Sequence, residues 1–309
     1  MHLRYQTNRN QIILLDPSSP RTFTTFDPNH LPLATTQHAI HPFNENNVLI
    51  VASRDGLVCV ALTETRQLAF WNPLTRAYKT FHTRFYDDLF KFTPMAFYSD
   101  SSNDYKFLHV VSVSEGAFIY SGRLDSWRKI NICPEIISGG YISNYTWHVG
   151  TFSRLKVYFL LQSKRSLNQP RLVSFDVESE EFKEIQFPPV PQGYYYSGLT
   201  LATRGGYALW LAYGDRHDGC LKCDLWRMDD DEGDGWIKLM TYSRPFCNGR
   251  IVPYKLAYVK KDGDLIVFTQ YYTIDTNYFF THFVCIEPVP WPFANAGAIY
   301  TETLVSPHP

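Results

Sequence analysis

An aromatic residue that opens the return strand of a β-hairpin recurs along this chain about every 50 residues. In each copy a short apolar strand comes first, then a turn built from turn-forming residues, and then the aromatic side chain. The five aromatics, which lie 55, 49, 55 and 54 residues apart, are Phe23, Tyr78, Trp127, Phe182 and Trp236. Repeats of this length indicate copies of one supersecondary unit that stack to bury a continuous core.

The stretch LAFWNPLTRAYKTF, residues 68–81, shows the repeated unit in full. Its first four residues have the composition of a short buried strand, and residues 72–75 form a turn because Pro73 fixes φ and disfavours helix before it. A hairpin at this period is typical of the short four-stranded antiparallel blades of kelch-type propellers, so we expect an all-β, propeller-like fold. We expect the structural aromatics of the blades to be Trp71, Tyr78, Trp127, Phe182 and Trp236, with the last four packed between neighbouring blades.

The composition agrees with a folded β-rich chain. The 309 residues are 45% hydrophobic and 16% aromatic, well above the content of a disordered chain. Their apolar stretches are short and alternating, with Gly, Pro, Asn and Asp between them. We expect about 45 to 50% strand, above the usual content of globular chains, with few and short helices. Residues 1–309 are expected to form one domain, in which residues 1–50 are an incomplete first blade and a connecting segment.

The charge balance excludes one class of partner. The chain has 29 basic and 30 acidic residues, so it lacks the cationic field that non-specific nucleic-acid binding requires. Its apolar runs are shorter than the roughly 20 residues of a membrane span, and its first residues contain no signal-peptide hydrophobic region. We therefore expect no nucleic-acid or membrane partner, and an intracellular location in the cytoplasm or nucleus. In that compartment the six cysteines are expected to be reduced.

One candidate zinc site has the spacing H-x2-C-x2-C. It consists of His217, Cys220 and Cys223, with Cys247 as the nearest possible fourth ligand. Cys220 and Cys223 lead into a predicted strand, where residues three apart point to opposite faces. We therefore expect no metal at these residues.

A candidate calcium loop lies in the acidic stretch DDDEGDG, residues 229–235. In a loop register that begins at Asp230, the carboxylates of Glu232 and Asp234 fall at ligand positions, but the twelfth position is Thr241 instead of a bidentate Glu. No helices are predicted on either side. We expect a solvated acidic hairpin loop.

Two tyrosine-rich stretches are candidate binding surfaces. In the first, Gly193 and Gly198 bracket Tyr194, Tyr195 and Tyr196, and no strand pattern requires these side chains to be buried. Aromatic loop residues bury much area on binding at a small cost in entropy, so we expect the three tyrosines to contact a partner. One of them could instead fill a blade junction. The second stretch, residues 271–280, fits a strand equally well.

No catalytic sequence pattern is present. The chain contains no G-x-S-x-G, G-x-x-x-x-G-K, H-E-x-x-H or G-x-G-x-x-G motif, and its ten histidines are scattered singly. Active sites can also assemble from distant loops, which such a search does not detect. With no positive support for catalysis, we expect a non-catalytic protein without a cofactor.

Several segments resemble one family, the plant F-box associated interaction domain of type 1. The matching segments occur in that family's order over roughly residues 1–306, and they read SRDGLVCV, FWNPLTRAYKTF, FYSDSSNDYKFLHVVSV, LVSFDVESEEFKEIQFP, CDLWRMDDDEGDGWIKL and YTETLVSP. Each segment alone is a weak match to the family, but the ordered series is fairly specific for it. The resemblance implies a propeller-like domain that captures targets for a Skp, cullin and F-box ubiquitin ligase.

The resemblance also implies a helical F-box of about forty residues that docks the Skp adaptor, and no segment here resembles one. Residues 1–4 look like those that follow that box, so we expect a truncated chain or a module that stands alone. The expected partner is an unidentified target protein, and the Skp adaptor is not expected to bind without the box. The alternative is a propeller enzyme or a carbohydrate binder, which would need polar side chains that converge at a central channel.

Overall fold

The computed structural model describes twenty segments of the chain. They are residues 10–15, 21–26, 37–46, 48–83, 95–112, 116–132, 145–147, 150–153, 155–163, 170–188, 195–203, 207–214, 220–229, 235–245, 250–259, 265–272, 279–283, 290–291, 297–301 and 304–308. Every regular element in these segments is a strand, and the strands make up about half of the chain. All sheet pairings are antiparallel, which confirms the all-β prediction.

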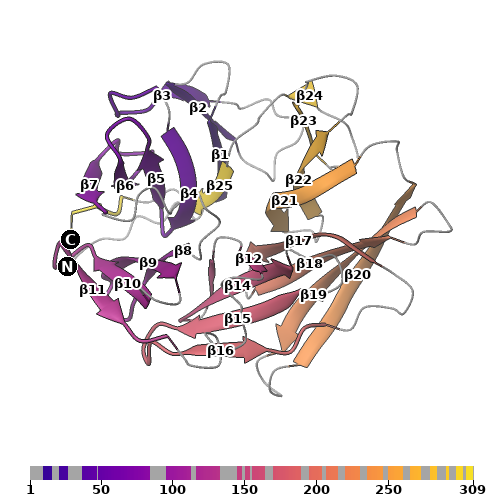
Figure 1. Ribbon diagram of the computed structural model, residues 1–309. Coiled ribbons are helices and arrows are strands. Elements are labelled where there is room, and N and C mark those ends of the chain that lie inside the picture. The colour runs from indigo at the N-terminus through magenta and orange to yellow at the C-terminus, as the bar shows by residue number, and fades with distance from the viewer. Residues whose placement is uncertain are drawn as a thin grey trace. The chain divides into compact units, whose positions relative to one another are not determined.

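Three sheets come from the first 130 residues together with one C-terminal strand (Figure 1). The first has the order β25-β1-β2-β3, with β1 (Asn10–Leu15), β2 (Thr22–Phe26), β3 (Gln37–Ile40) and β25 (Gly297–Thr301). The second contains β4 (Val48–Arg54), β5 (Leu57–Leu62), β6 (Gln67–Trp71) and β7 (Tyr78–His82). The third contains β8 (Met95–Ser99), β9 (Tyr105–Ser112), β10 (Gly116–Ser121) and β11 (Ser126–Ile130).

Three more sheets follow in chain order. The fourth has the order β12-β14-β15-β16, with β13 paired to β14, and contains β12 (Tyr145–Trp147), β13 (Thr151–Ser153), β14 (Lys156–Ser163), β15 (Arg171–Asp176) and β16 (Phe182–Ile185). The fifth contains β17 (Tyr195–Thr203), β18 (Tyr207–Gly214), β19 (Cys220–Asp229) and β20 (Gly235–Pro245). The sixth contains β21 (Arg250–Val259), β22 (Leu265–Tyr272), β23 (Phe279–Phe283) and β24 (Pro290–Trp291).

These sheets belong to two compact units. The first unit comprises Met1–Gln169, Val173–Lys183 and Asn295–Pro309, and the second comprises Pro170–Leu172 and Glu184–Ala294. The expectation of one domain over residues 1–309 stays a prediction. In the first unit, β25 supplies the fourth strand of a sheet whose other strands come from residues 10–40, so the N-terminal region forms a complete sheet only with the C-terminal strand.

The turn after Trp71 is built as the sequence predicted. The N–H of Asn72 donates to the carbonyl of Ala77 at 2.9 Å, and Asn72 Oδ1 accepts from the N–H groups of Leu74 and Thr75 at 2.9 and 3.2 Å. Arg76 has a φ of 61°, which reverses the chain direction before β7. The side chain of a buried asparagine therefore holds the turn together.

The turn between β15 and β16 repeats this arrangement with a carboxylate. The N–H of Asp176 donates to the carbonyl of Glu181 at 3.0 Å, and Asp176 Oδ1 accepts from the N–H groups of Glu178 and Ser179, both at 3.0 Å. Glu180 has a φ of 59°. Burial by itself raises the pKa of the Asp176 carboxyl, but the two backbone donors outweigh it and lower this pKa below its usual range.

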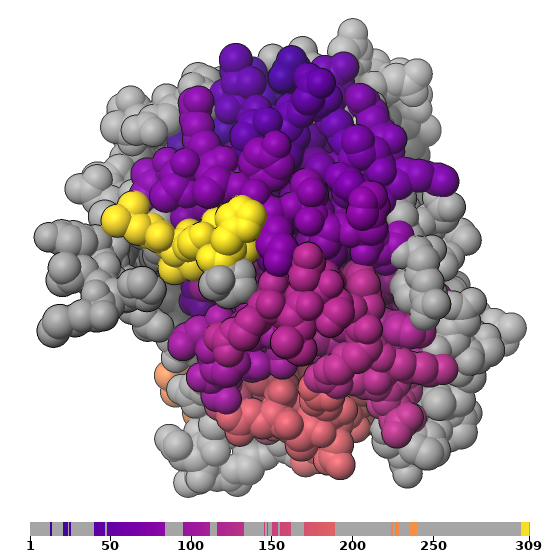
Figure 2. Space-filling view, turned by 90° about the vertical axis from the view of Figure 1, so that its left-hand side faces the viewer, coloured from indigo at the N-terminus to yellow at the C-terminus, as the bar shows by residue number. Residues whose placement is uncertain are grey.

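A C-terminal segment ties the first unit together. Asn72 Nδ2 donates to the carbonyl of Val305 at 2.8 Å, and Val305 packs against the core of the second and third sheets. Figure 2 shows this segment, in yellow, on the surface of the first unit. Lys79 links the same hairpin to the third sheet, because its Nζ donates to the carbonyl of Gly122 at 2.7 Å. Residues of the WNPLTRAYK stretch thus make contacts that stabilise the fold.

Candidate functional site

Four of the repeated aromatics occupy the start of the last strand in their sheets. Tyr78 and Phe182 are the first residues of β7 and β16, and Trp127 and Trp236 are the second residues of β11 and β20. Trp71, the last residue of β6, is fully buried and meets the ring of Phe23 edge-on at 4.9 Å.

Two of these positions carry an indole hydrogen bond to a backbone carbonyl at or just after the end of an earlier strand. Trp127 Nε1 donates to the carbonyl of His82, the last residue of β7, at 2.8 Å. Trp236 Nε1 donates to the carbonyl of Gln186, the residue after β16, at 2.7 Å. Both indoles are half-buried. Trp127 thus uses its polar edge to contact the end of the preceding sheet, and Trp236 uses the same edge to contact the residue that follows β16.

Tyr78 makes a related contact through its ring alone. Its side chain is 41% exposed, and its ring lies 5.0 Å from that of Phe43, which follows β3 of the preceding sheet. The position thus makes contact with the preceding sheet even where the hydrogen-bonding indole is absent.

Phe182 is the deepest of the four aromatics. Its side chain is 5% exposed, and its ring packs at 4.8 Å from Phe175. It shares a core with Ile130 and Ile132, which lie at the end of β11 and just beyond it. Phenylalanine has no N–H to donate, so this junction lacks the indole hydrogen bond of its neighbours.

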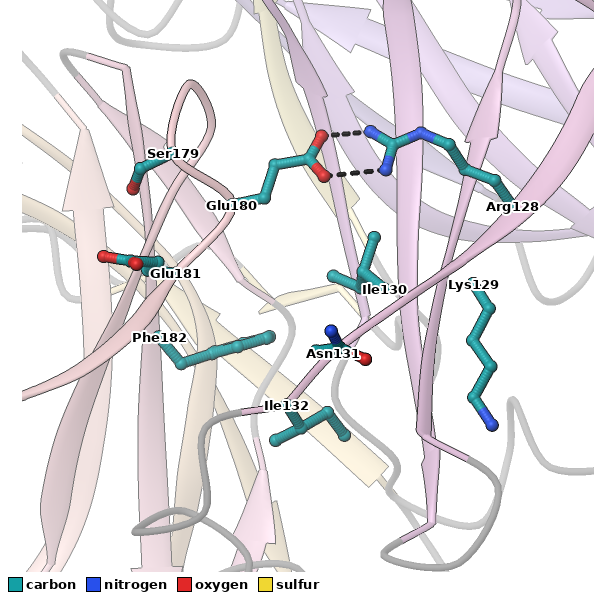
Figure 3. A pocket seen from close by; sticks show the side chains of 9 residues that line it. All are labelled: Arg128, Lys129, Ile130, Asn131, Ile132, Ser179, Glu180, Glu181 and Phe182. Carbon is teal, nitrogen blue, oxygen red and sulfur yellow. Dashed lines mark hydrogen bonds and ion pairs between the residues drawn. The ribbon is translucent and has the colours of Figure 1, made fainter.

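A groove of about 700 Å³ opens at the junction that contains Phe182. One wall is the end of β11 and the residues after it, and the other is the turn before β16 (Figure 3). Its lining residues are Arg128, Lys129, Ile130, Asn131, Ile132, Ser179, Glu180, Glu181 and Phe182. All of them belong to the first unit, and the volume is in the range of ligand sites.

An ion pair connects the two walls of the groove. Arg128 Nη1 donates to Glu180 Oε2 at 2.7 Å, and Arg128 Nη2 donates to the other oxygen of the same carboxylate. Figure 3 shows the two side chains meeting across the groove. The hydrogen bonds that Arg128 donates to Glu180 raise the pKa of Arg128 above its usual value. This bidentate geometry fixes both side chains and neutralises their charges.

The other resolved pKa shifts have local structural causes. Burial raises the pKa of the Asp100 carboxyl, but hydrogen bonds from Lys106, Ser102 and the Asp104 N–H outweigh burial and lower this pKa to about 2. Burial also raises the pKa of the Tyr98 and Tyr120 hydroxyls. These shifts keep each group in its usual charge state near neutral pH.

The tyrosine stretch lies on a strand where the sequence predicted a loop. Tyr195 and Tyr196 begin β17, and their register partners on β18 are Gly214 and Tyr213. The prediction of a loop is therefore wrong for these two residues, because backbone pairing with β18 continues to Tyr195. Tyr194 lies outside the described residues. The partner-binding role of Tyr194, Tyr195 and Tyr196 stays a prediction.

The candidate metal residues fall partly within the described segments. Cys220 and Cys223 lie on β19, while His217 and Cys247 lie outside the segments that the structure describes. Within those segments no three His, Cys, Asp or Glu side chains are grouped to hold a metal. The acidic stretch connects β19 to β20, as a hairpin loop does, and its residues 230–234 also lie outside. No helix among the described residues is long and apolar enough to cross a membrane.

The sequence reasoning missed the groove residues Arg128, Asn131 and Glu180. Charged residues in a hairpin give no signal of their own, because most of them are solvated. A signal for the groove was present in the aromatic repeat. It has Phe182 at the position that Trp127 and Trp236 occupy in the neighbouring repeats.

Comparison with known proteins gives distant structural similarities and one family. The SapL1 lectin in complex with alpha methyl fucoside is 10% identical to this chain, with a TM-score of 0.45. The match covers 94% of this chain and 97% of the lectin chain. The RRP9 WD40 repeats are 9% identical, with coverages of 85% and 91% and a TM-score of 0.42. The Dos1 propeller is 10% identical, with coverages of 96% and 87% and a TM-score of 0.42. Similarity at this level carries no argument for shared function.

No curated protein matches the sequence. Residues 7–286 match the F-box associated beta propeller domain, which is nearly the whole chain and includes both the repeated hairpins and the groove. The six sheets of antiparallel strands agree with a propeller built from four-stranded blades. The chain belongs to the F-box associated beta propeller domain family.

Proposed function

We propose that this chain is a non-catalytic target-recognition module, and that it presents proteins to a Skp, cullin and F-box ubiquitin ligase. The observation that carries the proposal is the family match over residues 7–286. A module of this kind needs a surface that holds a segment of another protein, and it needs neither a cofactor nor a catalytic residue.

The groove between β11 and the turn before β16 is the contact surface in this proposal. It combines buried apolar side chains with a fixed ion pair and exposed polar groups, the mixture that is common at protein interfaces. The bidentate pair between Arg128 and Glu180 connects its two walls, which favours a groove whose shape is set before binding. Preorganisation of this kind reduces the entropy lost on association.

Affinity capture from cells, with the proteasome inhibited, tests the proposal. The tagged wild-type chain is compared with Asn131→Trp, which places a bulky side chain in the groove from an exposed position. A matched control is Leu124→Trp, because Leu124 is 71% exposed and does not line the groove. We expect wild type and control to recover the same proteins and the groove variant to lose at least one of them.

A second measurement tests the connection to ubiquitin. Proteins that only the open groove captures should carry less ubiquitin and persist longer in cells from which the chain has been removed. Unchanged lifetimes would contradict the ligase role, and unchanged capture by Asn131→Trp would remove the groove from the interface. Replacing Tyr194, Tyr195 and Tyr196 by Ser tests the alternative surface.

A further inference from the structure

The hydrogen bonds of Trp127 and Trp236 define an equivalent position at the groove. Trp127 donates to the carbonyl of His82, which lies four residues after Tyr78. Trp236 donates to the carbonyl of Gln186, which lies four residues after Phe182. By the same spacing, the carbonyl at the third junction belongs to Asn131, four residues after Trp127.

Asn131 lines the groove, and the aromatic residue that faces it is Phe182. Figure 3 shows the Phe182 ring directed toward the segment that carries Asn131. The ring provides apolar surface but no donor, so the acceptor at this junction is not supplied by the chain's own aromatic residue. At this junction the chain's own aromatic ring is present, but that ring lacks the N–H donor that an indole supplies at the two others.

We infer that the groove binds the indole side chain of a tryptophan in a partner polypeptide, with the indole N–H donating to the carbonyl of Asn131. The inference rests on the proposed function, since the partner is the recognised target. The bound indole supplies at this junction the N–H donor that Trp127 supplies to His82 and Trp236 supplies to Gln186.

The chemistry of the walls fits an uncharged aromatic donor. Ile130, Ile132 and Phe182 line the groove and are 7%, 8% and 5% exposed, so each contributes a small apolar surface for ring contacts. Arg128 and Glu180 pair through both Nη atoms of the guanidinium and both oxygens of the carboxylate. A carboxylate or phosphate ligand would have to break this bidentate pair.

The other cationic side chain of the groove, that of Lys129, also contacts a residue outside the groove. Lys129 Nζ lies 6.0 Å from the ring centroid of Phe118, a residue that does not line the groove. Complementarity of charge thus favours a neutral group over an anion. The volume of about 700 Å³ exceeds that of one indole, so the flanking residues of a peptide can enter with it.

A phage-displayed library of random peptides, selected on the whole chain, tests the inference. We expect enrichment of tryptophan in the peptides that bind wild type and the Leu124→Trp control. Two blocking variants should abolish this enrichment: Asn131→Trp, and Phe182→Trp, which supplies the missing indole from the chain itself. Circular dichroism and thermal unfolding verify that each variant is folded. Because residue 131 is exposed, Asn131→Trp keeps the test decisive if Phe182→Trp does not fold.

Calorimetric titration of an enriched peptide then tests the donor. The same peptide with 1-methyltryptophan, which lacks the N–H, should bind about five- to tenfold more weakly, the effect of losing one hydrogen bond. The inference is overturned if the library enriches no tryptophan, if enrichment survives Asn131→Trp, or if methylation leaves the affinity unchanged. Cellular capture that depends on the groove, without tryptophan selection, would overturn this inference and leave the proposed function intact.

Discussion

The junction at Trp127 and the junction at Phe182 use one repeat position in two ways. At the first, the indole reaches the carbonyl of His82 and its ring lies 6.3 Å from that of Phe81 in the preceding sheet. At the second, the phenyl ring is buried in the core, and an ion pair between Arg128 and Glu180 connects the two sides of a groove. The hydrogen-bonded junction thus has an indole at this repeat position, and the junction with the groove has a phenyl ring.

Truncation of the two aromatics gives the largest expected effects and ranks their contributions. Phe182→Ala should lower the free energy of unfolding by about 3 to 5 kcal/mol, because it leaves a cavity in a packed core. Trp127→Ala should cost about 2 to 3 kcal/mol, since a half-buried ring loses less contact although it also loses a hydrogen bond. Urea denaturation measures both. A greater loss for Trp127→Ala would contradict the assignment of Phe182 to the core.

Replacing Trp127 by phenylalanine, the aromatic type at residue 182, measures how much the indole N–H contributes to stability. Trp127→Phe keeps most of the ring contacts and removes the donor, so it should cost about 1 kcal/mol. The denaturation midpoint should therefore lie between those of wild type and Trp127→Ala. If Trp127→Phe and Trp127→Ala have the same denaturation midpoint, the hydrogen bond stabilises the junction and the ring contacts do not.

Acid should weaken the turn that leads into Phe182. The pKa of Asp176 is lowered in the folded chain, so its contribution to stability is present above the pKa of the unfolded chain and is lost as pH falls below it. Asp176→Asn keeps an acceptor at Oδ1, as Asn72 does in its own turn, and cannot titrate. Thermal unfolding between pH 7 and pH 3 should show a smaller decline for this variant.

Asp100 provides the reference for that measurement. Its pKa of about 2 gives the same direction of pH dependence, and it is present in both wild type and Asp176→Asn. The difference between the two curves therefore reports Asp176. Parallel curves would mean that the turn before Phe182 does not depend on the charge of its carboxylate.

The ion pair at the groove should have the smallest effect on stability. The side chains of Arg128 and Glu180 are 47% and 24% exposed, and pairs of this kind contribute about 0 to 1 kcal/mol. A double-mutant cycle with Arg128→Met and Glu180→Gln measures the coupling. A coupling above about 2 kcal/mol would show that the pair contributes more to the junction than an exposed ion pair does.

The repeated hairpin and its turn were predictable because their causes are local. Alternation of apolar residues, Pro73 and the aromatic spacing lie within one stretch of chain, and the structure has β6, the turn and β7 where the sequence predicted them. The loop predicted at Tyr195 and Tyr196 was wrong because strand pairing with β18 outweighed the flanking glycines. The groove could not be predicted, since its walls are brought together only when two hairpins pack.

The sequence by itself determined the all-β class, the hairpin period and the position of each repeated aromatic, because side-chain patterning and turn chemistry act over a few residues. Only the tertiary structure decided that β25 completes the first sheet and that Asn72 holds Val305, 233 positions away. Sheet edges and carbonyls are chemically alike along the chain, so local sequence does not encode which of them meet. Packing of the whole core selects the partners, and at Phe182 it leaves the groove.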